Sequence, residues 1–246
     1  AYSVIGNEFY NDRATASYTA LDMRRGFEQC VIADNIINLA TSKDATGIYT
    51  EYIKAGQEAP GSIHNNEINI VCNANAGAYS SFYGIKVGSK EVSTNLNIVY
   101  NTVRLTGVYN SSAALFINSS ISNGAVRNNI LQNEATGHVY RIYSKDYFTG
   151  IVFSNNMTYT SGTAFAYAGT AVNDFEAWKV LSGEKDSYNE QTSFLSETVL
   201  EPAQTGNLKN AKPLAFVTTD LNGTVRDEQT PTIGAYEYGD VSDNTP

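Results

Sequence analysis

A short phrase of apolar and polar positions recurs along the first two thirds of the chain. Two mostly apolar residues are followed by a variable residue, an asparagine or aspartate, another variable residue and an apolar residue. The phrase reads VIGNEF, VIADNI, IHNNEI, IVYNTV, AVRNNI and VFSNNM. Its fourth position is Asn7, Asp34, Asn66, Asn101, Asn128 and Asn155. The intervals of 27, 32, 35, 27 and 27 residues indicate an internal repeat, because three equal intervals are hard to obtain by chance.

A second, apolar column supports the same repeat unit. In four of five repeats it stands 14 positions after the fourth-position residue, at Leu21, Ile48, Leu115 and Ile142. In the third repeat the equivalent residue is Ile85, displaced by 5 positions. A unit of 14 plus 13 residues fits one coil of short strands that pair in parallel with the neighbouring coils. The repeated Asn would then stack at an inward corner, where Asn tolerates the left-handed backbone conformation.

These patterns predict an all-β fold, a right-handed parallel β-helix of about six coils. We expect the coils to occupy residues 1–168 and a C-terminal capping segment, residues 169–246, to pack on them. Within the cap, NDFEAWKVLSG predicts a short helix that begins at the N-cap Asn173 and ends at Gly183. Trp178 on this helix would cover the apolar end of the solenoid.

The column of asparagines resembles the asparagine ladder of the pectate-lyase-like right-handed β-helix superfamily, over residues 1 to about 160. In that superfamily the strand that follows this corner lines the substrate cleft. The resemblance therefore implies a carbohydrate site on the strands that contain Leu21 and its equivalents. It does not identify a reaction, because these solenoids include lyases, hydrolases and proteins without activity.

Insertions relative to the 27-residue unit flank the same strands, at residues 53–62, 73–82 and 88–95. Insertions in a solenoid often surround its binding face. Strand alternation predicts which side chains point outward there. One position after the apolar column are Asp22, Tyr49, Lys86, Phe116 and Tyr143; three after it are Arg24, Glu51, Gly88, Asn118 and Lys145; one before it are Ala20, Gly47, Gly84, Ala114 and Arg141. We expect the three loops to frame one groove on this face.

The predicted face favours β-elimination over hydrolysis. The candidate catalytic residues are Lys86, Arg141 and Tyr143, which could neutralise a uronate carboxylate and accept or relay its C5 proton. The candidate substrate-binding residues are Asp22, Arg24, Tyr49, Glu51, Phe116 and Lys145. Hydrolysis needs two facing carboxylates, whereas Asp22 and Glu51 are the only acids in the two outward columns. Ca²⁺ is the one cofactor that the predicted reaction allows, although a Ca²⁺ site usually needs more acids than these. No other cofactor is indicated.

Two interpretations of this face stay open. Aromatic and charged residues are common on any solvent-facing strand, so the protein could equally be a non-catalytic glycan-binding or adhesin-like module. In both cases the expected partner is a polysaccharide or other glycan. Nothing in the sequence is expected to precede and cover the first coil, so either residues 1–20 cap it themselves, or a preceding region or another chain packs there. The histidines add little: His64 falls in a column of apolar residues and is expected in the core, and His138 has no obvious carboxylate beside it.

Composition limits the partners further. The formal net charge is -9, from 16 Lys and Arg against 25 Asp and Glu, which argues against nucleic acid as a partner because its binding needs a basic surface. No apolar run approaches the roughly 18 residues of a membrane span, so we expect no membrane insertion. Cys30 and Cys72 fall in different columns, which predicts two buried free thiols rather than a disulfide.

The tail DLNGTVRDEQTPTIGAYEY carries a second resemblance. Its pattern resembles the closing signature of secreted β-helix proteins of the Bacteroidetes type, most of which have no known activity. The matching residues are Asp220, Gly223, Arg226, Ile233, Gly234, Ala235, Tyr236 and Glu237. The resemblance implies a secreted, periplasmic or cell-surface protein. We expect Asp220 and Arg226 to form a structural ion pair and Gly223 to form a turn.

Overall fold

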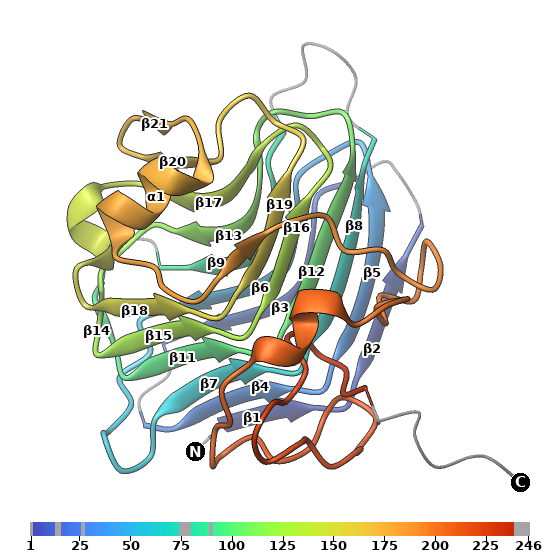
Figure 1. The fold of residues 1–246 in the computed structure, drawn as a ribbon. Coiled ribbons are helices and arrows are strands. Elements are labelled where there is room, and N and C mark those ends of the chain that lie inside the picture. Colours follow the sequence, from blue (N-terminus) through green and yellow to red (C-terminus); the bar gives the residue numbers. More distant parts are fainter. Residues whose placement is uncertain (1, 13–15, 26–27, 74–79, 89–90, 239–246) are drawn as a thin grey trace, which may run out of the picture.

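The computed structural model describes residues 2–12, 16–25, 28–73, 80–88 and 91–238. Over these residues the chain forms a parallel β-solenoid of about six turns, in agreement with the repeat (Figure 1). Each turn contributes one strand to each of three sheets, called here A, B and C. Short strands with matched spacing stack in this way because each coil satisfies its backbone hydrogen bonds with the coils on either side.

Sheet A runs in the order β1 (Tyr2–Ile5), β4 (Cys30–Ala33), β7 (Gly61–His64), β11 (Leu96–Val99), β15 (Gly124–Arg127), β18 (Ile151–Ser154). Sheet B runs β2 (Glu8–Asn11), β5 (Ile36–Thr41), β8 (Glu67–Cys72), β12 (Thr102–Gly107), β16 (Ile130–Asn133), β19 (Met157–Thr160), β22 (Tyr188–Asn189). Sheet C runs β3 (Tyr18–Arg24), β6 (Ala45–Glu51), β9 (Phe82–Val87), β13 (Ser112–Ile117), β17 (His138–Ile142), β20 (Ala166–Ala168), β21 (Ala171–Val172). A short pair, β10 (Ser93–Thr94) and β14 (Ile121–Ser122), lies at the corner between C and A.

An asparagine ladder runs through the corner between sheets A and B. Its members are Asn7, Asn35, Asn66, Asn101, Asn129 and Asn156. The Nδ2 of each donates to the Oδ1 of the next, at 2.9 to 3.1 Å. The ladder ends on Glu184, whose carboxylate accepts from Asn156 at 2.9 Å and is buried. Buried side-chain amides that are hydrogen-bonded to one another stabilise the stack of coils, whereas an unpaired buried amide would destabilise it.

The predicted column was wrong by one residue in three coils. Asp34, Asn128 and Asn155 each precede a ladder residue and have φ values of 54 to 57°. Gly6, Asn65 and Tyr100 occupy the same place in the other coils, with φ values of 52 to 69°. The corner thus consists of one left-handed residue followed by one inward Asn. Because Asn suits both positions, an Asn-Asn pair does not reveal from sequence which member faces inward.

The chain after β21 both caps the solenoid and returns along its side. Helix α1 (Phe175–Ser182) covers the last coil (Figure 1), where Trp178 is fully buried and stacks on Tyr140 at 4.6 Å between ring centroids. Its N-cap is Asp174, which accepts from the Ala177 amide, and not Asn173 as the sequence suggested. Gly183 ends the helix in the left-handed conformation, as expected. The remaining tail, including η2 (Gly206–Asn210), runs back over sheet B and the ladder corner.

Three smaller findings complete the fold. Cys30 and Cys72 are buried free thiols, as predicted. No helix among the described residues has the length and apolar character needed to span a bilayer. On the first coil, Tyr2 and Ile5 of the terminal strand β1 expose 58% and 53% of their surface.

Candidate functional site

The outer face of sheet C carries a row of six side chains, one from each of six consecutive coils. In strand order they are Asp22, Tyr49, Lys86, Phe116, Arg141 and Tyr167. Four of the five residues predicted one position after the apolar column therefore share this row. Arg141 takes the place expected for Tyr143, because Ile142 pairs with Ile117 rather than with Leu115.

Three of the small residues expected to point outward one position before the apolar column do not lie on this face. Gly47, Gly84 and Ala114 point into the core: a Cβ on Gly84 would lie 2.3 Å from Val103 Cγ1, and Ala114 is fully buried. On β13, for example, the consecutive residues Ala114 and Leu115 both face the core, which interrupts the alternation of inward and outward side chains. The outward neighbours of the main row are instead Thr46, Tyr83, Ala113 and His138. Tyr83 and Tyr167 were missed by the sequence analysis, although each lies on a strand of the same sheet.

Cations and aromatic rings alternate along the row. The Lys86 Nζ lies 4.5 Å from the ring centroid of Tyr49 and 5.8 Å from those of Tyr83 and Phe116. The Arg141 guanidinium lies 5.6 Å from Phe116 and 5.9 Å from Tyr167. These distances fall within the range of favourable cation–π contacts. The rings themselves are largely covered, with Tyr49 only 7% and Phe116 only 8% exposed.

The two acids of the face are already engaged. Asp22 forms a bidentate pair with Arg24, at 2.8 Å from Nε and 2.7 Å from Nη2. This hydrogen bond raises the pKa of Arg24. Glu51 accepts from the Tyr49 hydroxyl at 2.7 Å. Two facing carboxylates, as hydrolysis requires, are therefore not assembled from these residues.

Lys86 and Arg141 differ from these paired groups. Neither has a carboxylate within 4 Å among the described residues, and Arg141 makes one long hydrogen bond, 3.4 Å to Ser111 Oγ. Partial burial, followed by the charge of Arg24, lowers the pKa of the Lys86 ammonium. A half-buried amine with a lowered pKa is a stronger candidate for binding an anion or accepting a proton than an exposed lysine.

The last two predicted residues lie at the rim. Tyr143 is 65% exposed, and its ring stacks on Tyr147 at 6.4 Å with an interplanar angle of 21°. Its amide donates to the Ile117 carbonyl, which keeps it beside the sheet. Lys145 has left the strand and begins the short helix η1 (Lys145–Phe148). It therefore lies outside the row, in contrast to the strand position that the sequence suggested.

The histidines occupy two different surroundings. His138 lies on the sheet C face, 6.2 Å from the Tyr167 ring, and burial lowers its pKa. His64 pairs with Val99, as its place in the apolar column predicts, but with Ala33 in place of Ile32. It lies on the outer side of sheet A, so its expected place in the core is wrong. Burial and the nearby charge of Arg226 lower the pKa of His64 to about 4.

The predicted loops are only partly described. Residues 74–79 and 89–90 lie outside the described residues. In the first loop, Ile53 and Ala55 are buried and Lys54 pairs with Thr94, so its beginning is part of a coil corner and does not project. Within the part of the chain that the structure describes, no group of three or more His, Cys, Asp and Glu side chains is arranged to hold a metal ion.

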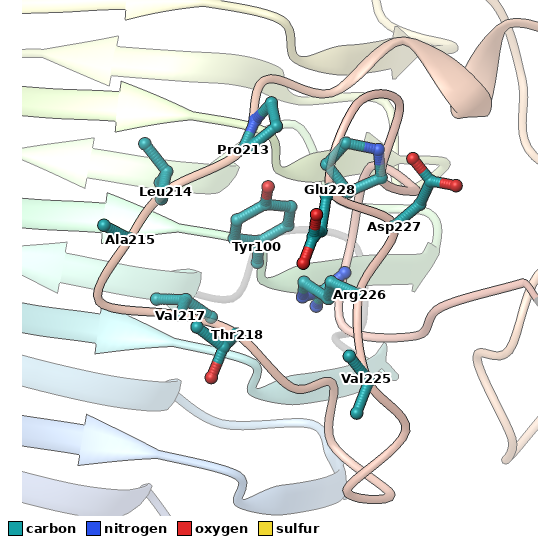
Figure 2. Close-up of a pocket in the computed structure, with 11 residues that line it drawn as sticks. Tyr100, Pro213, Leu214, Ala215, Val217, Thr218, Val225, Arg226, Asp227 and Glu228 are labelled. Atoms are coloured by element: carbon teal, nitrogen blue, oxygen red, sulfur yellow. The ribbon is translucent and has the colours of Figure 1, made fainter.

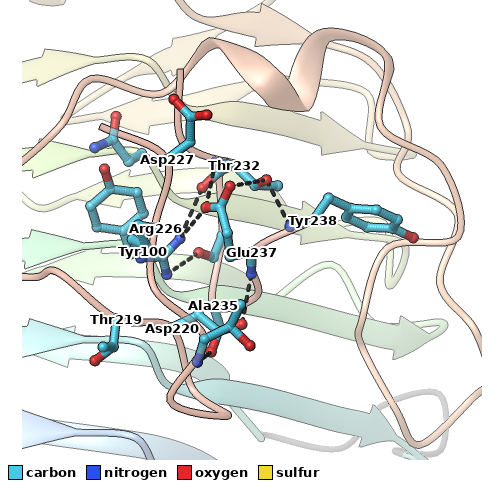
Figure 3. Close-up of polar contacts among 12 residues, drawn as sticks. Tyr100, Thr219, Asp220, Arg226, Asp227, Thr232, Ala235, Glu237 and Tyr238 are labelled. Carbon is cyan, nitrogen blue, oxygen red and sulfur yellow. Dashed lines mark hydrogen bonds and ion pairs between the residues drawn. The ribbon is translucent and has the colours of Figure 1, made fainter. Parts of the chain in front are cut away.

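Near the C-terminal end of the described chain, Asp220, Arg226 and Glu237 form a group of polar contacts on the ladder corner, called the clasp below (Figure 3). The expected ion pair is wrong: Arg226 pairs with Glu237 at 3.4 Å, and its Nη2 donates to Asn65 Oδ1 at 2.8 Å. Asp220 instead accepts backbone amides, among them that of Glu237 at 2.8 Å. Gly223 has a φ of 81° in a turn, as predicted. These contacts give the signature a structural role in holding the tail to the coils.

A cavity of about 360 Å³ lies between the clasp and the coils (Figure 2). Its walls are mainly apolar, with Tyr100, Leu214 and Val217 on one side and Arg226 on the other. The Arg226 guanidinium packs 3.9 Å from the Tyr100 ring centroid. This cavity is on the tail-covered side of the solenoid and shares no residue with the sheet C row.

Comparison with protein-family models, curated proteins and solved structures found no match for this chain.

Proposed function

We propose that this protein binds an acidic polysaccharide along the outer face of sheet C. The observation that carries the proposal is the pair of cations Lys86 and Arg141, which flank Phe116 in one row and lack a carboxylate partner among the described residues. Their strands are two steps apart, so the backbones that carry them are separated by about 10 Å. Carboxylate or sulfate groups spaced along one glycan chain would meet both cations.

Charge, more than ring stacking, supports this ligand class. The rings of Tyr49 and Phe116 are covered by their neighbours, which leaves little area for the faces of neutral sugars. The exposed ring of Tyr143, stacked on Tyr147, is better suited to contact a sugar at the rim. The net charge of -9 opposes a polyanion at long range, so the local cations must act within a Debye length of about 8 Å.

A lyase activity is the second candidate, favoured by the lowered pKa of Lys86. In β-elimination a base removes the uronate C5 proton, a C4–C5 double bond forms, the C4–O bond to the next sugar breaks, and the departing oxygen takes up a proton. Arg141 would neutralise the uronate carboxylate, and Lys86 or Tyr143 would accept the C5 proton and relay it to the departing oxygen. The engagement of Asp22 by Arg24 and of Glu51 by Tyr49 argues against hydrolysis.

Membership of the pectate-lyase-like superfamily and a secreted or cell-surface location belong to the same proposal. The asparagine ladder supports the first. The C-terminal signature, with its clasp of Asp220, Arg226 and Glu237, supports the second.

Titration with polygalacturonate, alginate and heparin, with neutral dextran for comparison, tests the proposal. We expect binding of at least one acidic polymer, weakened about tenfold in Lys86→Gln and Arg141→Gln. The control is Lys43→Gln, which removes an exposed cation between β5 and β6 and should bind as the parent does. Ultraviolet absorbance from unsaturated products, lost in Lys86→Gln, would identify a lyase. Binding without products would identify a binding module. Equal binding of dextran, or none of any acidic polymer, would refute the proposal.

A further inference from the structure

A second group of cations lines a cavity of about 340 Å³ on the outer side of sheet A. The cavity lies beside β18, where the chain leaves helix α1. Arg127, Lys185 and Lys212 contribute to its walls, and Asp186 is the one acid among its lining residues. Three cations around one small cavity are unexpected in a chain with a net charge of -9.

The strand register stacks these groups. Arg127 on β15 pairs in parallel with Ser154 on β18, and Ser154 pairs in parallel with Lys185. Paired residues of a parallel sheet project from the same face, about 4.8 Å apart along the hydrogen-bonding direction. The cavity wall therefore presents a guanidinium from β15, a hydroxyl from β18 and an ammonium group from Lys185, which forms an isolated bridge with β18. Lys212 approaches from the returning tail.

Two cations of this wall, Arg127 and Lys185, have side-chain donors without a partner among the described residues. The Nε of Arg127 is buried and has no hydrogen-bond partner among the described residues, a costly state for a charged donor. Lys185 has no ion pair within the described part of the chain. Lys212 meets Asp186 at 3.5 Å, but both side chains are more than half exposed, and such pairs contribute little.

We propose that this cavity binds an oxyanion, a carboxylate, sulfate or phosphate group, carried on a molecule about the size of a monosaccharide. The anion would lie over Ser154, between Arg127 and Lys185, and accept hydrogen bonds from all three. The volume lies at the lower end of the range for small-molecule sites, about 300 to 1,000 Å³. Val152, 51% exposed, adds an apolar wall for the carrier. This site is on a different sheet from the Lys86 row, so it does not depend on the function proposed there.

Calorimetric titration of inorganic phosphate, sulfate and glucuronate tests the site. The parent protein should bind at least one of them at a single site. Arg127→Met keeps the apolar stem and removes the buried donor, so we expect an unchanged melting temperature. This variant and Lys185→Gln should each weaken binding about tenfold or more. The probe with the highest affinity distinguishes a carboxylate sugar from a free sulfate or phosphate.

A matched control makes the result decisive. Lys43→Gln removes one exposed cation elsewhere and should leave the affinity unchanged. Failure of all three probes to bind the parent protein at millimolar concentration would overturn the proposal. Equal losses in Lys43→Gln and Lys185→Gln would also overturn it, because they would indicate general attraction to charge instead of a site.

Discussion

The outer faces of sheets B and C both carry cations, but Arg104 on sheet B has carboxylate partners, whereas Lys86 and Arg141 on sheet C have none among the described residues. On sheet B, Arg104 pairs with Glu134, which follows β16, at 2.8 Å and with Glu197 of the returning tail at 2.9 Å. On sheet C no described carboxylate lies within 4 Å of Lys86 or Arg141, although aromatic rings surround both. A cation that the fold itself neutralises is a structural element. A half-buried cation that no described carboxylate contacts is available to pair with an anionic ligand.

Asn101→Leu should produce the largest effect on the tail-covered side. The Asn101 Nδ2 donates to Asn129 Oδ1, to the Ile63 carbonyl and to the Val99 carbonyl, and its Oδ1 accepts from Asn66. Leucine would leave these buried groups unpaired, so we expect the free energy of unfolding to fall by about 3 to 5 kcal/mol. Urea denaturation measures this loss. Asn110→Leu, at an exposed turn, is the control and should change it by less than about 0.5 kcal/mol.

His64 should give the tail-covered side a pH dependence. Its folded-state pKa is about 4 and its ordinary value is 6.5, so the native state binds fewer protons than the unfolded state between these values. The free energy of unfolding should therefore fall as the pH drops from 6.5 to 4, by about 2 kcal/mol. His64→Leu, next to Val99 and Ala33, should remove that part of the decline. Identical slopes for parent and variant in urea denaturation at pH 7 and 4 would contradict the assignment.

A matched pair of substitutions tests the contrast between the two faces directly. Arg104→Met leaves Glu134 without its cation, and we expect a loss of about 1 to 2 kcal/mol in the free energy of unfolding. Lys86→Met removes an amine that burial disfavours in its charged form, and should change the free energy by less than about 0.5 kcal/mol or raise it. If Lys86→Met proves as costly as Arg104→Met, Lys86 is part of the fold and the binding face loses its central residue.

Much of the fold could be predicted because a solenoid repeats its own signals. Stacked coils require apolar residues at matched positions, and Ile32, Ile63 and Ile98 satisfy this in consecutive coils of sheet A. The pairing register of the sheet C strands was harder to predict. Two coils of equal total length can divide their residues differently between the segments before and after the sheet C strand. Asn101 precedes its sheet C partner Leu115 by 14 residues, whereas Asn129 precedes Tyr140 by 11. A shorter strand β16 before β17 and a longer connection after β17 preserved the period and displaced Arg141 into the row.

The candidate face was predictable in type but not in detail. Lys86, Tyr49 and Phe116 share a row because parallel pairing aligns equivalent positions. Nothing local in the sequence distinguishes Arg104, which meets Glu197 from a distant tail, from Arg141, which meets no carboxylate among the described residues. The role of Glu184 was also missed, although it stands 28 residues after Asn156, one coil length further on. The repeat pattern was defined by asparagine side chains, so a glutamate at the next ladder position was not recognised as part of it.

The direction of the ladder has an electrostatic consequence. Every side-chain amide donates toward the C-terminal coil, from Asn7 to Asn156, so the dipoles add head to tail as they do along an α-helix. The positive end of this column falls at Asn156, and the acceptor there is the carboxylate of Glu184. Burial raises the pKa of Glu184, but donors from Asn156, Ser187, Trp178 and Tyr140 all oppose that shift. The carboxylate thus acts as a built-in counterion for the summed dipole. A neutral glutamine there would set its own NH₂ group against donors from the cap and lose the charge that the column favours.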